Sequence, residues 1–198
     1  MIGAMPRERH FFEPEVLDRL TDAFTTHGYA GTSLTLLQEA TGLGKQSLYN
    51  TFGDKQAMYL QAIDCAVQHA ARGTAAMEAA ANGRAALALY FDMVVQRCAS
   101  ADPRQRNCIV TNGLLEGLDD ASLSRTLTSH WRATHELLRS TVERGQRDGS
   151  IISPTPSAQL AELLIALASG LRVAARVGRN QSQMESLVAL TLGVLDMA

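Results

Sequence analysis

Closely spaced glycines divide residues 14–53 into three short segments, and this spacing limits the fold more than any other feature of the sequence. Gly28, Gly42 and Gly53 each follow a stretch with apolar residues at helical spacing. Glycine adopts the left-handed conformation that ends many helices without a clash of a Cβ atom, so each predicts a helix end. Three short helices with tight corners are typical of a helix-turn-helix unit. The predicted helices run from Pro14 to His27, from Thr32 or Ser33 to Gly42, and from Lys45 to Phe52.

The remainder of the chain predicts longer helices. Ala and Leu recur throughout, whereas aromatic residues make up only 5 % of the sequence, and this composition favours helices over strands. Turn-forming residues separate predicted helices at about 55–80, 84–100, 108–117, 121–148, 155–178 and 182–197. We therefore expect an all-α protein, in which an N-terminal arm (1–12) precedes a three-helix helix-turn-helix domain (13–54) and a larger helical bundle (55–198).

The charge balance gives no compositional sign of a nucleic-acid binder. The net charge is −2, and the first sixty residues hold five Lys or Arg against seven Asp or Glu. Any basic surface must therefore arise from the placement of side chains. The three cysteines match neither a disulfide framework nor a CxxC metal motif, the first residues include no apolar secretory segment, and the longest apolar runs are about half the ~18 residues that a membrane span requires. We expect a cytoplasmic protein with reduced thiols and no membrane association.

The third predicted helix has an apolar and a polar side. Leu48 and Phe52 share one face and are expected to anchor it. The opposite side offers amide, hydroxyl, ammonium and phenol groups without a carboxylate, which suits base edges and phosphates, although a solvated surface has a similar composition. Hydroxyls at the start of the preceding helix and a lysine after Gly53 suit phosphate. The predicted DNA contacts are Thr32, Ser33, Lys45, Gln46, Ser47, Tyr49, Asn50 and Lys55.

The run FTTHGYAGTSLTLLQEATGLGKQSLYNTFGDKQAMYLQAI resembles the N-terminal domain of TetR/AcrR-type transcriptional regulators. The resemblance implies a homodimer that binds a palindromic DNA operator, most often as a repressor released by a small-molecule effector. Two positions depart from the family pattern, because Gly44 replaces the usual Ser and Gln46 the usual Gly. We expect Gln46 to discriminate bases. The shared features, in the family's order, are Phe24, Gly28-Tyr29, Thr32-Ser33, Gly42, Leu48-Tyr49, Phe52-Gly53 and Lys55.

The same resemblance implies an effector pocket among the middle helices and a dimer interface formed by the last two. Segments 158–178 and 183–197 are apolar over much of their circumference, which suits either an interface or a core. A two-fold interface would require a palindromic operator. The expected dimerisation residues are Leu160, Leu164, Leu167, Leu171, Leu187, Leu190 and Val194. The expected pocket residues, which also suit an ordinary core, are Tyr90, Phe91, Met93, Val94, Cys108, Leu114 and Trp131.

Cys108 suggests an alternative mode of regulation. It lies in RNCIVTNGLLEGLDD, which resembles a segment through which some TetR-like regulators are thought to sense electrophiles, oxidants or metals. Arg106 and a helix N-terminus would stabilise its thiolate, and Cys98 is a candidate resolving thiol. The alternative is an inert, packed thiol. Cys65 and His69 lie one helical turn apart, but the spacing shows no third ligand, so no metal site is predicted.

A helical enzyme is the competing class of protein. It would need convergent titratable groups, and the sequence contains neither paired Glu-x-x-His motifs nor a nucleophile elbow. A dimer that lacks an effector pocket and binds DNA constitutively is a third possibility. We predict a regulator that is not an enzyme and needs no cofactor, with operator DNA, a small-molecule effector and a second copy of the chain as its partners. Arg7 and Arg9 in the arm suit either a minor groove or a solvated tail.

Overall fold

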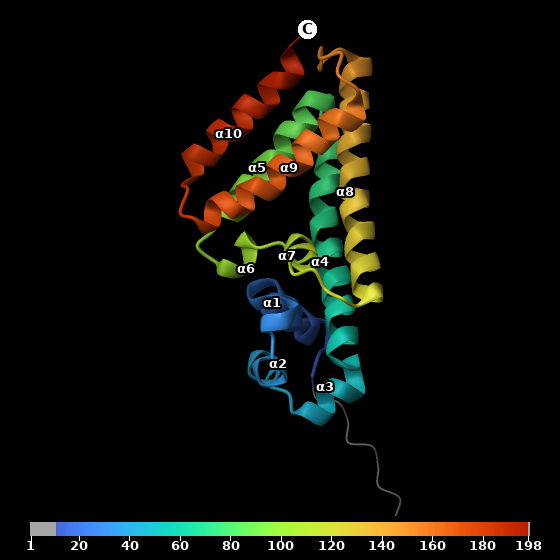
Figure 1. The fold of residues 1–198 in the computed structure, drawn as a ribbon, viewed down its shortest axis with the longest axis vertical. Coiled ribbons are helices and arrows are strands. Elements are labelled where there is room, and N and C mark those ends of the chain that lie inside the picture. Colours follow the sequence, from blue (N-terminus) through green and yellow to red (C-terminus); the bar gives the residue numbers. More distant parts are fainter. Residues whose placement is uncertain (1–10, 198) are drawn as a thin grey trace, which may run out of the picture.

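The computed structural model describes residues 11–197, and within this range the chain is helical without a β-strand (Figure 1). This confirms the all-α prediction. The elements are α1 (Glu13–Gly31), α2 (Leu34–Thr41), α3 (Lys45–Phe52), α4 (Lys55–Glu78), α5 (Gly83–Ala99), α6 (Pro103–Arg106), α7 (Ile109–Leu115), α8 (Ala121–Asp148), α9 (Ser157–Arg176), α10 (Gln181–Gly193) and a final 3-10 turn, η1 (Val194–Asp196).

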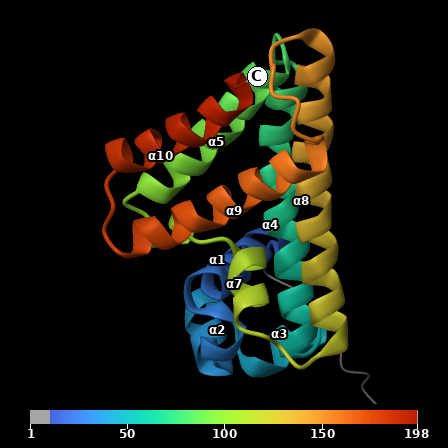
Figure 2. The same cartoon turned by 45° about the horizontal axis from the view of Figure 1, so that its top comes forward.

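The helices gather at two ends of an elongated molecule. α1, α2 and α3 form one end, and α4 leads from α3 into the bundle alongside α8 (Figure 1). α5, α9 and α10 lie at the opposite end, where α9 and α10 form part of the outer surface (Figure 2). Each end has its own apolar core. The core beneath α1–α3 also includes Tyr59 of α4, Ile109 of α7 and Leu127 of α8, so the helix-turn-helix unit packs directly against the bundle.

Local capping interactions account for the short helices at the first end. The Ser33 hydroxyl accepts a hydrogen bond from the Leu36 N–H at 3.2 Å, so Ser33 is the residue that caps α2. Gly42 follows α2 in the left-handed conformation, as its position in the sequence predicts. The Asp54 carboxylate accepts from the Ala57 N–H at 2.8 Å and caps α4. The bounds of α3 are those predicted from its flanking glycines.

One local prediction is confirmed with an addition, and another needs correction. The first helix was expected to end before Gly28, and this glycine, with φ 75° and ψ 175°, interrupts the helix as predicted; one more turn follows it, so that α1 ends at Gly31. The Glu116 carboxylate, which follows α7, accepts the N–H groups of Tyr29 and Ala30 and supports this turn. The segment around Pro103 was expected to be a plain break. It instead forms the single-turn helix α6, which the Asp102 carboxylate caps by accepting the Arg104 N–H at 3.0 Å.

The C-terminal helices divide their apolar residues between the protein's own core and its surface. Leu160, Leu164 and Leu171 are at most 2 % exposed and pack in the second core, so their prediction as dimerisation residues is wrong. Leu167 and Val194 are partly buried against the same core. An apolar helix with two stripes can bury either one, and the sequence alone did not identify which. The exposed apolar residues are Leu163 and Val173 on α9, Val177 directly after it, and Leu187 and Leu190 on α10.

α9 is also the one helix within residues 11–197 that is long and apolar enough to cross a membrane by length and composition alone. Glu162 and Arg172 interrupt this helix, so its uninterrupted apolar runs stay short, as the sequence predicts. One face of α9 packs against α5 and α8 in the second core. A core helix of this kind passes the same length test, so the feature is weak evidence for a membrane span.

Candidate nucleic-acid interface

α3 presents a polar surface that its two apolar residues hold in place. Leu48 is 0 % and Phe52 5 % exposed, and both lie in the core shared with α1 and α4, as predicted. The five side chains predicted to contact DNA from this helix are all exposed, and none is a carboxylate. The structure thus brings these predicted contacts together on one outward surface. They are Lys45, Gln46, Ser47, Tyr49 and Asn50.

Two pairs of side chains are already organised on this surface. The Gln46 amide donates from Nε2 to Oδ1 of Asn50 at 2.8 Å, one helical turn away. The remaining Gln46 carbonyl and Asn50 amino groups together provide an acceptor and donors, which is the combination that recognises an adenine edge. The Lys45 ammonium lies 5.7 Å from the centroid of the Tyr49 ring, within the range of a cation–π contact. These contacts restrict the side-chain rotamers before any ligand binds.

The start of α3 has no side-chain cap. Gly44 occupies the N-cap position with φ −70° and ψ 155°, and its carbonyl accepts the N–H groups of Ser47 and Leu48 at 3.0 and 3.1 Å. The first N–H groups of the helix therefore have no side-chain partner at an exposed, partially positive helix end. A Cβ atom at Gly44 would meet nothing within 4 Å, so the serine that is usual in the resembling family would fit here.

One of the two hydroxyls predicted to contact phosphate is unavailable. Thr32 is 0 % exposed, and its hydroxyl donates to the Gly28 carbonyl at 2.6 Å, so the prediction of a DNA contact for Thr32 is wrong. Its role is to hold the turn after Gly28. Ser33 is exposed, and its oxygen accepts the Leu36 N–H, which leaves the hydroxyl proton available to a phosphate. Sequence position alone could not separate these neighbouring hydroxyls.

Lys55 is held against the protein at the start of α4. Its ammonium lies 4.4 Å from the centroid of the Tyr29 ring, and the side chain is partly buried. Burial lowers the pKa of Lys55, and the nearby Glu116 carboxylate opposes this shift by raising it. The aromatic contact fixes the direction of the ammonium, so Lys55 remains a predicted phosphate contact with a defined orientation.

Glu116 is a structural residue of this end that the sequence did not reveal. Its two carboxylate oxygens accept the backbone N–H groups of Tyr29 and Ala30, each at 2.9 Å. A Cβ atom at Gly28 would lie 2.0 Å from Glu116 Oε1, so the carboxylate occupies space that only glycine leaves open. Glu116 follows α7 directly and therefore joins the turn before α2 to the bundle. A contact over 87 residues leaves no local sequence signal.

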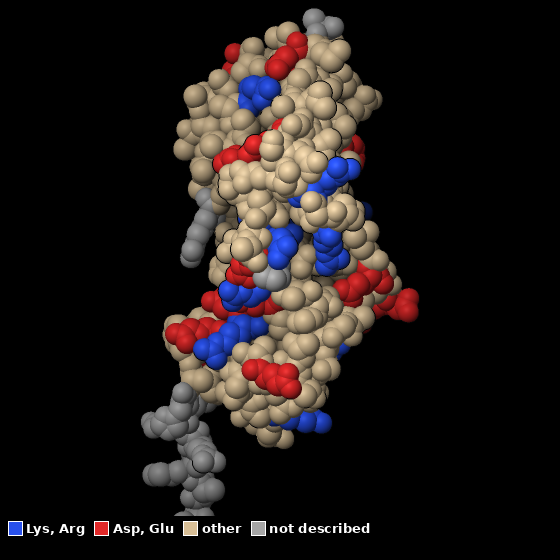
Figure 3. Space-filling model, turned by 90° about the vertical axis from the view of Figure 1, so that its left-hand side faces the viewer, with Lys and Arg blue, Asp and Glu red and all other residues tan. Residues whose placement is uncertain are grey.

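Charged side chains are distributed differently over the two ends. On the side of the molecule in Figure 3, Lys and Arg interleave with Asp and Glu over the lower part, which includes the α1–α3 end, whereas the part that carries α9 and α10 is largely uncharged. No extended basic surface is visible on this face. Any attraction of α3 for DNA would therefore depend on a few placed groups, as the balanced composition predicted. The predicted arm with Arg7 and Arg9 lies outside the described residues.

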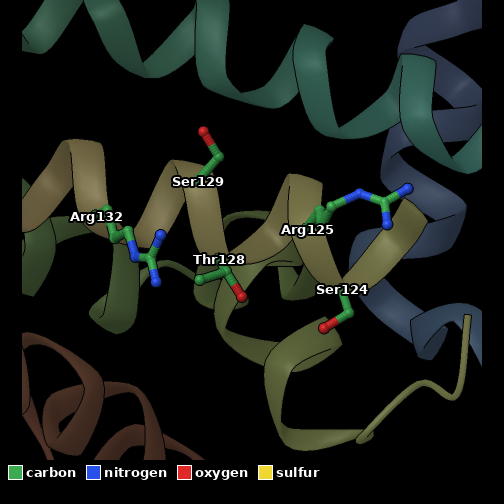
Figure 4. A pocket seen from close by; sticks show the side chains of 5 residues that line it. All are labelled: Ser124, Arg125, Thr128, Ser129 and Arg132. Carbon is green, nitrogen blue, oxygen red and sulfur yellow. The ribbon is translucent and has the colours of Figure 1, made fainter. Parts of the chain in front are cut away.

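The predicted effector residues line neither of two depressions of the surface. One depression, of about 390 Å³, lies along α8, where Ser124, Thr128 and Arg132 point to the same side (Figure 4). A second, of about 260 Å³, lies between α1 and α2 near Arg104. Phe91 and Val94 pack in the second core, with Tyr90 and Trp131 partly buried against it. Met93 and Leu114 are also partly buried, so the effector assignments remain predictions.

Cys108 lies at the start of α7 and faces a cation that the sequence did not identify. Burial raises the pKa of this thiol. The opposing effects are larger, and they come from the Arg172 guanidinium, the Thr111 hydroxyl and the N–H groups of Thr111 and Val110. The pKa therefore falls below its ordinary value. The predicted cation, Arg106, donates instead to the Ala101 carbonyl at 3.3 Å. Burial raises the pKa of the neighbouring Cys98 thiol.

Cys65 and His69 have a third partner, contrary to the expectation from spacing. Asp18 of α1 approaches both side chains, with its Oδ1 atom 3.4 Å from Cys65 Sγ and 3.6 Å from His69 Nε2. The prediction that no third ligand accompanies this pair is therefore wrong. The approach joins residues 47 positions apart, which a spacing argument within one helix cannot detect.

Known proteins resemble this chain in sequence and in structure. The family model "Bacterial regulatory proteins, tetR family" matches residues 16–62, which include α2 and α3. The chain is 27 % identical over 188 residues to the HTH-type transcriptional repressor ComR of Escherichia coli K12, covering 94 % of this chain and 90 % of ComR. It is 29 % identical over 202 residues to the uncharacterized HTH-type transcriptional regulator YezE of Bacillus subtilis 168, covering 97 % and 100 %.

A solved structure extends the likeness to the whole fold. A cysteine mutant of the TetR family transcriptional regulator CifR, complexed with 26-base-pair double-strand operator DNA, superimposes with a TM-score of 0.85 at 27 % identity. The match covers 94 % of this chain and 98 % of that one. The helix-turn-helix geometry, the family match over α2 and α3, and the full-length likeness agree. The chain therefore carries a helix-turn-helix domain of the tetR family type in residues 16–62 and is similar over its whole length to TetR family regulators.

Proposed function

We propose that this protein is a homodimeric, sequence-specific DNA-binding transcriptional regulator and that α3 enters the major groove. The observation that carries the proposal is the division of α3, in which Leu48 and Phe52 are buried and the polar side chains face outward. The absence of a carboxylate on that surface favours approach to phosphates. The naming of ComR as a repressor supports repression as the direction of control. The protein acts by binding in the cytoplasm and not by catalysing a reaction.

In this proposal the exposed side chains of α3 divide into two roles. Gln46 and Asn50, already joined by a hydrogen bond, form the unit that reads a base pair. Lys45, Tyr49 and Lys55 contact phosphates and set the register of the helix in the groove. Ser33 adds a hydroxyl at the N-terminus of α2, where helix N–H groups favour an anion.

The dimer surface in this proposal uses the exposed stripe of α9 and α10. Leu163, Val173, Val177, Leu187 and Leu190 are between 41 % and 75 % exposed in the single chain. Large apolar side chains concentrated on two adjacent, sparsely charged helices are typical of an obligate interface. A two-fold axis through such an interface would place the two α3 helices on half-sites of a palindrome.

The experiment is selection of bound DNA from a random pool, followed by binding measurements with variants. We expect a palindromic consensus and an affinity that falls steeply as salt rises. Gln46→Ala should lose about 1–3 kcal/mol of discrimination at one base pair of each half-site, whereas Lys45→Ala should weaken all sequences alike and reduce the salt slope by about one unit. Gln68→Ala, at an exposed glutamine of α4, is the matched control and should change neither quantity.

Two different results would reject different parts of the proposal. A pool without an enriched sequence would reject sequence-specific binding. An enriched sequence whose recognition is unaffected by Gln46→Ala would leave the regulator intact but reject the base-reading role of that residue.

A second mode of control is favoured by the surroundings of Cys108. We propose two alternative modes of regulation. In one, a small molecule binds in the bundle; in the other, the Cys108 thiol is oxidised or alkylated. The lowered pKa of Cys108 and its position at the start of α7 support the second mode. α7 is also the helix that Glu116 connects to the turn before α2, so a change at Cys108 would have a short structural path to the DNA-binding end.

The two modes are separated by treating the operator complex with an oxidant and, in parallel, with a library of small molecules. If the oxidant releases the unmodified protein from DNA but does not release the Cys108→Ser variant, thiol control is supported. Release that persists in Cys108→Ser rejects it. Thermal stabilisation by a small molecule, unaffected by that substitution, supports the ordinary effector mode.

A further inference from the structure

We propose that Asp18, Cys65 and His69 form a binding site for a divalent transition-metal ion of the zinc class, between α1 and α4. Cys65 and His69 lie one turn apart on α4, and Asp18 projects from α1. Thiolate, imidazole and carboxylate are the three side-chain ligands that Zn²⁺ uses most. Among the residues that the structure describes, this is the one group of three such side chains whose ligand atoms converge.

The distances between the ligand atoms fit a shared ion. The separations are 3.4 Å from Cys65 Sγ to Asp18 Oδ1, 3.6 Å from His69 Nε2 to Asp18 Oδ1, and 4.0 Å from Cys65 Sγ to His69 Nε2. Tetrahedral angles and Zn–ligand bonds of about 2.0–2.3 Å place ligand atoms roughly 3.3–3.6 Å apart. The three atoms therefore need to move by less than about half an ångström to surround one ion.

Hydrogen bonding accounts for one of the three contacts, because the Cys65 thiol donates to Asp18 Oδ1 at 3.4 Å, but it accounts less well for the other two. The distance between the His69 imidazole and the Asp18 carboxylate is longer than an ordinary N–H···O hydrogen bond, which is about 2.7–3.2 Å. The contact between the thiol and the imidazole is longer still. Asp22, which also lies near this thiol, pairs with the Arg104 guanidinium at 2.8 Å and is therefore not free to act as a fourth ligand.

Burial around the cluster leaves one side open to solvent. Cys65 is 8 % exposed, whereas the side chains of Asp18 and His69 are 53 % and 54 % exposed. An ion could enter from this side, and water would complete its coordination as the fourth ligand. Since Asp18 belongs to the helix-turn-helix end and the other two residues to α4, the bound ion would tie these helices together where α4 leaves that end (Figure 1).

The test is a titration of the reduced, chelator-treated full-length protein with Co²⁺, followed by Zn²⁺. We expect a thiolate-to-cobalt absorption band that saturates at one ion per chain and is lost on addition of Zn²⁺, which binds such sites more tightly than Co²⁺. Cys65→Ser should abolish the band, and His69→Gln and Asp18→Asn should each weaken or abolish it. The last two substitutions are at exposed positions, so a helical circular dichroism spectrum is expected to be retained.

Matched controls come from the same protein. His130 pairs with Asp64 at 3.5 Å and resembles the His69–Asp18 pair, but no thiol joins it in a group of three. His130→Gln, Cys98→Ser and Cys108→Ser should leave the band unchanged. The absence of a band in the unmodified protein, its survival in Cys65→Ser, or its loss in His130→Gln would each overturn the assignment. These outcomes do not depend on DNA binding, so they are independent of the proposed function.

Discussion

α3 and α9 differ in how completely their sequences determine which side faces the protein. α3 has two strongly apolar positions on one face, and both are buried. α9 is apolar over most of its circumference, and its adjacent residues Leu163 and Leu164 are 41 % and 0 % exposed. A helix with one apolar stripe has one way to bury it, whereas a helix with two stripes depends on its neighbours. The polar surface of α3 was therefore predictable, and the free surface of α9 was not.

The largest expected effect concerns the anchoring of α3. Leu48→Ala should lower the free energy of unfolding by about 2–5 kcal/mol, because it removes a fully buried side chain and leaves a cavity. Ser47→Ala, at the exposed neighbouring position, should change stability by less than about 0.5 kcal/mol while weakening DNA binding. Urea denaturation measures the free energy of unfolding of both variants. Equal losses of stability would contradict the division of α3 into two faces.

Substitutions of Glu116 test how the bundle holds the end of the molecule that carries α1–α3. Glu116→Ala leaves the N–H groups of Tyr29 and Ala30 without their carboxylate partner, and we expect a loss of about 1–3 kcal/mol in the free energy of unfolding. Glu116→Gln keeps one acceptor oxygen and should lose less. Hydrogen exchange at these two amides localises the effect. Unchanged exchange rates in Glu116→Ala would show that the contact does not protect the turn.

The proposed dimer surface on α9 is tested by placing a charge on it. Leu163→Asp should weaken dimerisation by about tenfold or more, equivalent to ~1.4 kcal/mol, since an unpaired carboxylate would be desolvated in an apolar interface. Leu89→Asp is the matched control, because Leu89 is 42 % exposed on α5 and should leave association unchanged. Sedimentation at several protein concentrations gives the dissociation constants. Similar constants for both variants would place the interface elsewhere.

The smallest effect concerns the thiols of the bundle. Because the pKa of Cys108 is lowered, its alkylation by iodoacetamide should reach its maximal rate at a lower pH than that of an ordinary cysteine. Arg172→Leu removes the nearby positive charge, so the pKa should rise and the rate profile should move to higher pH. Mass spectrometry follows each cysteine separately. Cys98, whose pKa is raised by burial, should react only at higher pH. An unmoved profile in Arg172→Leu would exclude that guanidinium as the cause.

Local signals explain which parts of the candidate site could be predicted. The bounds of α3, the cap at Ser33 and the outward position of Gln46 follow from apolar spacing, glycine positions and a capping hydroxyl. Thr32 could not be separated from Ser33 in this way, because its burial depends on the turn that Gly28 makes. The same limit applies to Leu164, whose burial depends on the helices packed against α9.

The sequence by itself determined that this protein is helical and that its N-terminal part is a helix-turn-helix unit, because these features depend on residues within a few turns of one another. Only the tertiary structure decided which groups act together across the chain. Asp18 approaches Cys65 over 47 positions and Glu116 approaches Tyr29 over 87, and Arg172 of α9 faces Cys108. The physical reason is that such contacts depend on how complete helices pack, and no local pattern of residues specifies that packing.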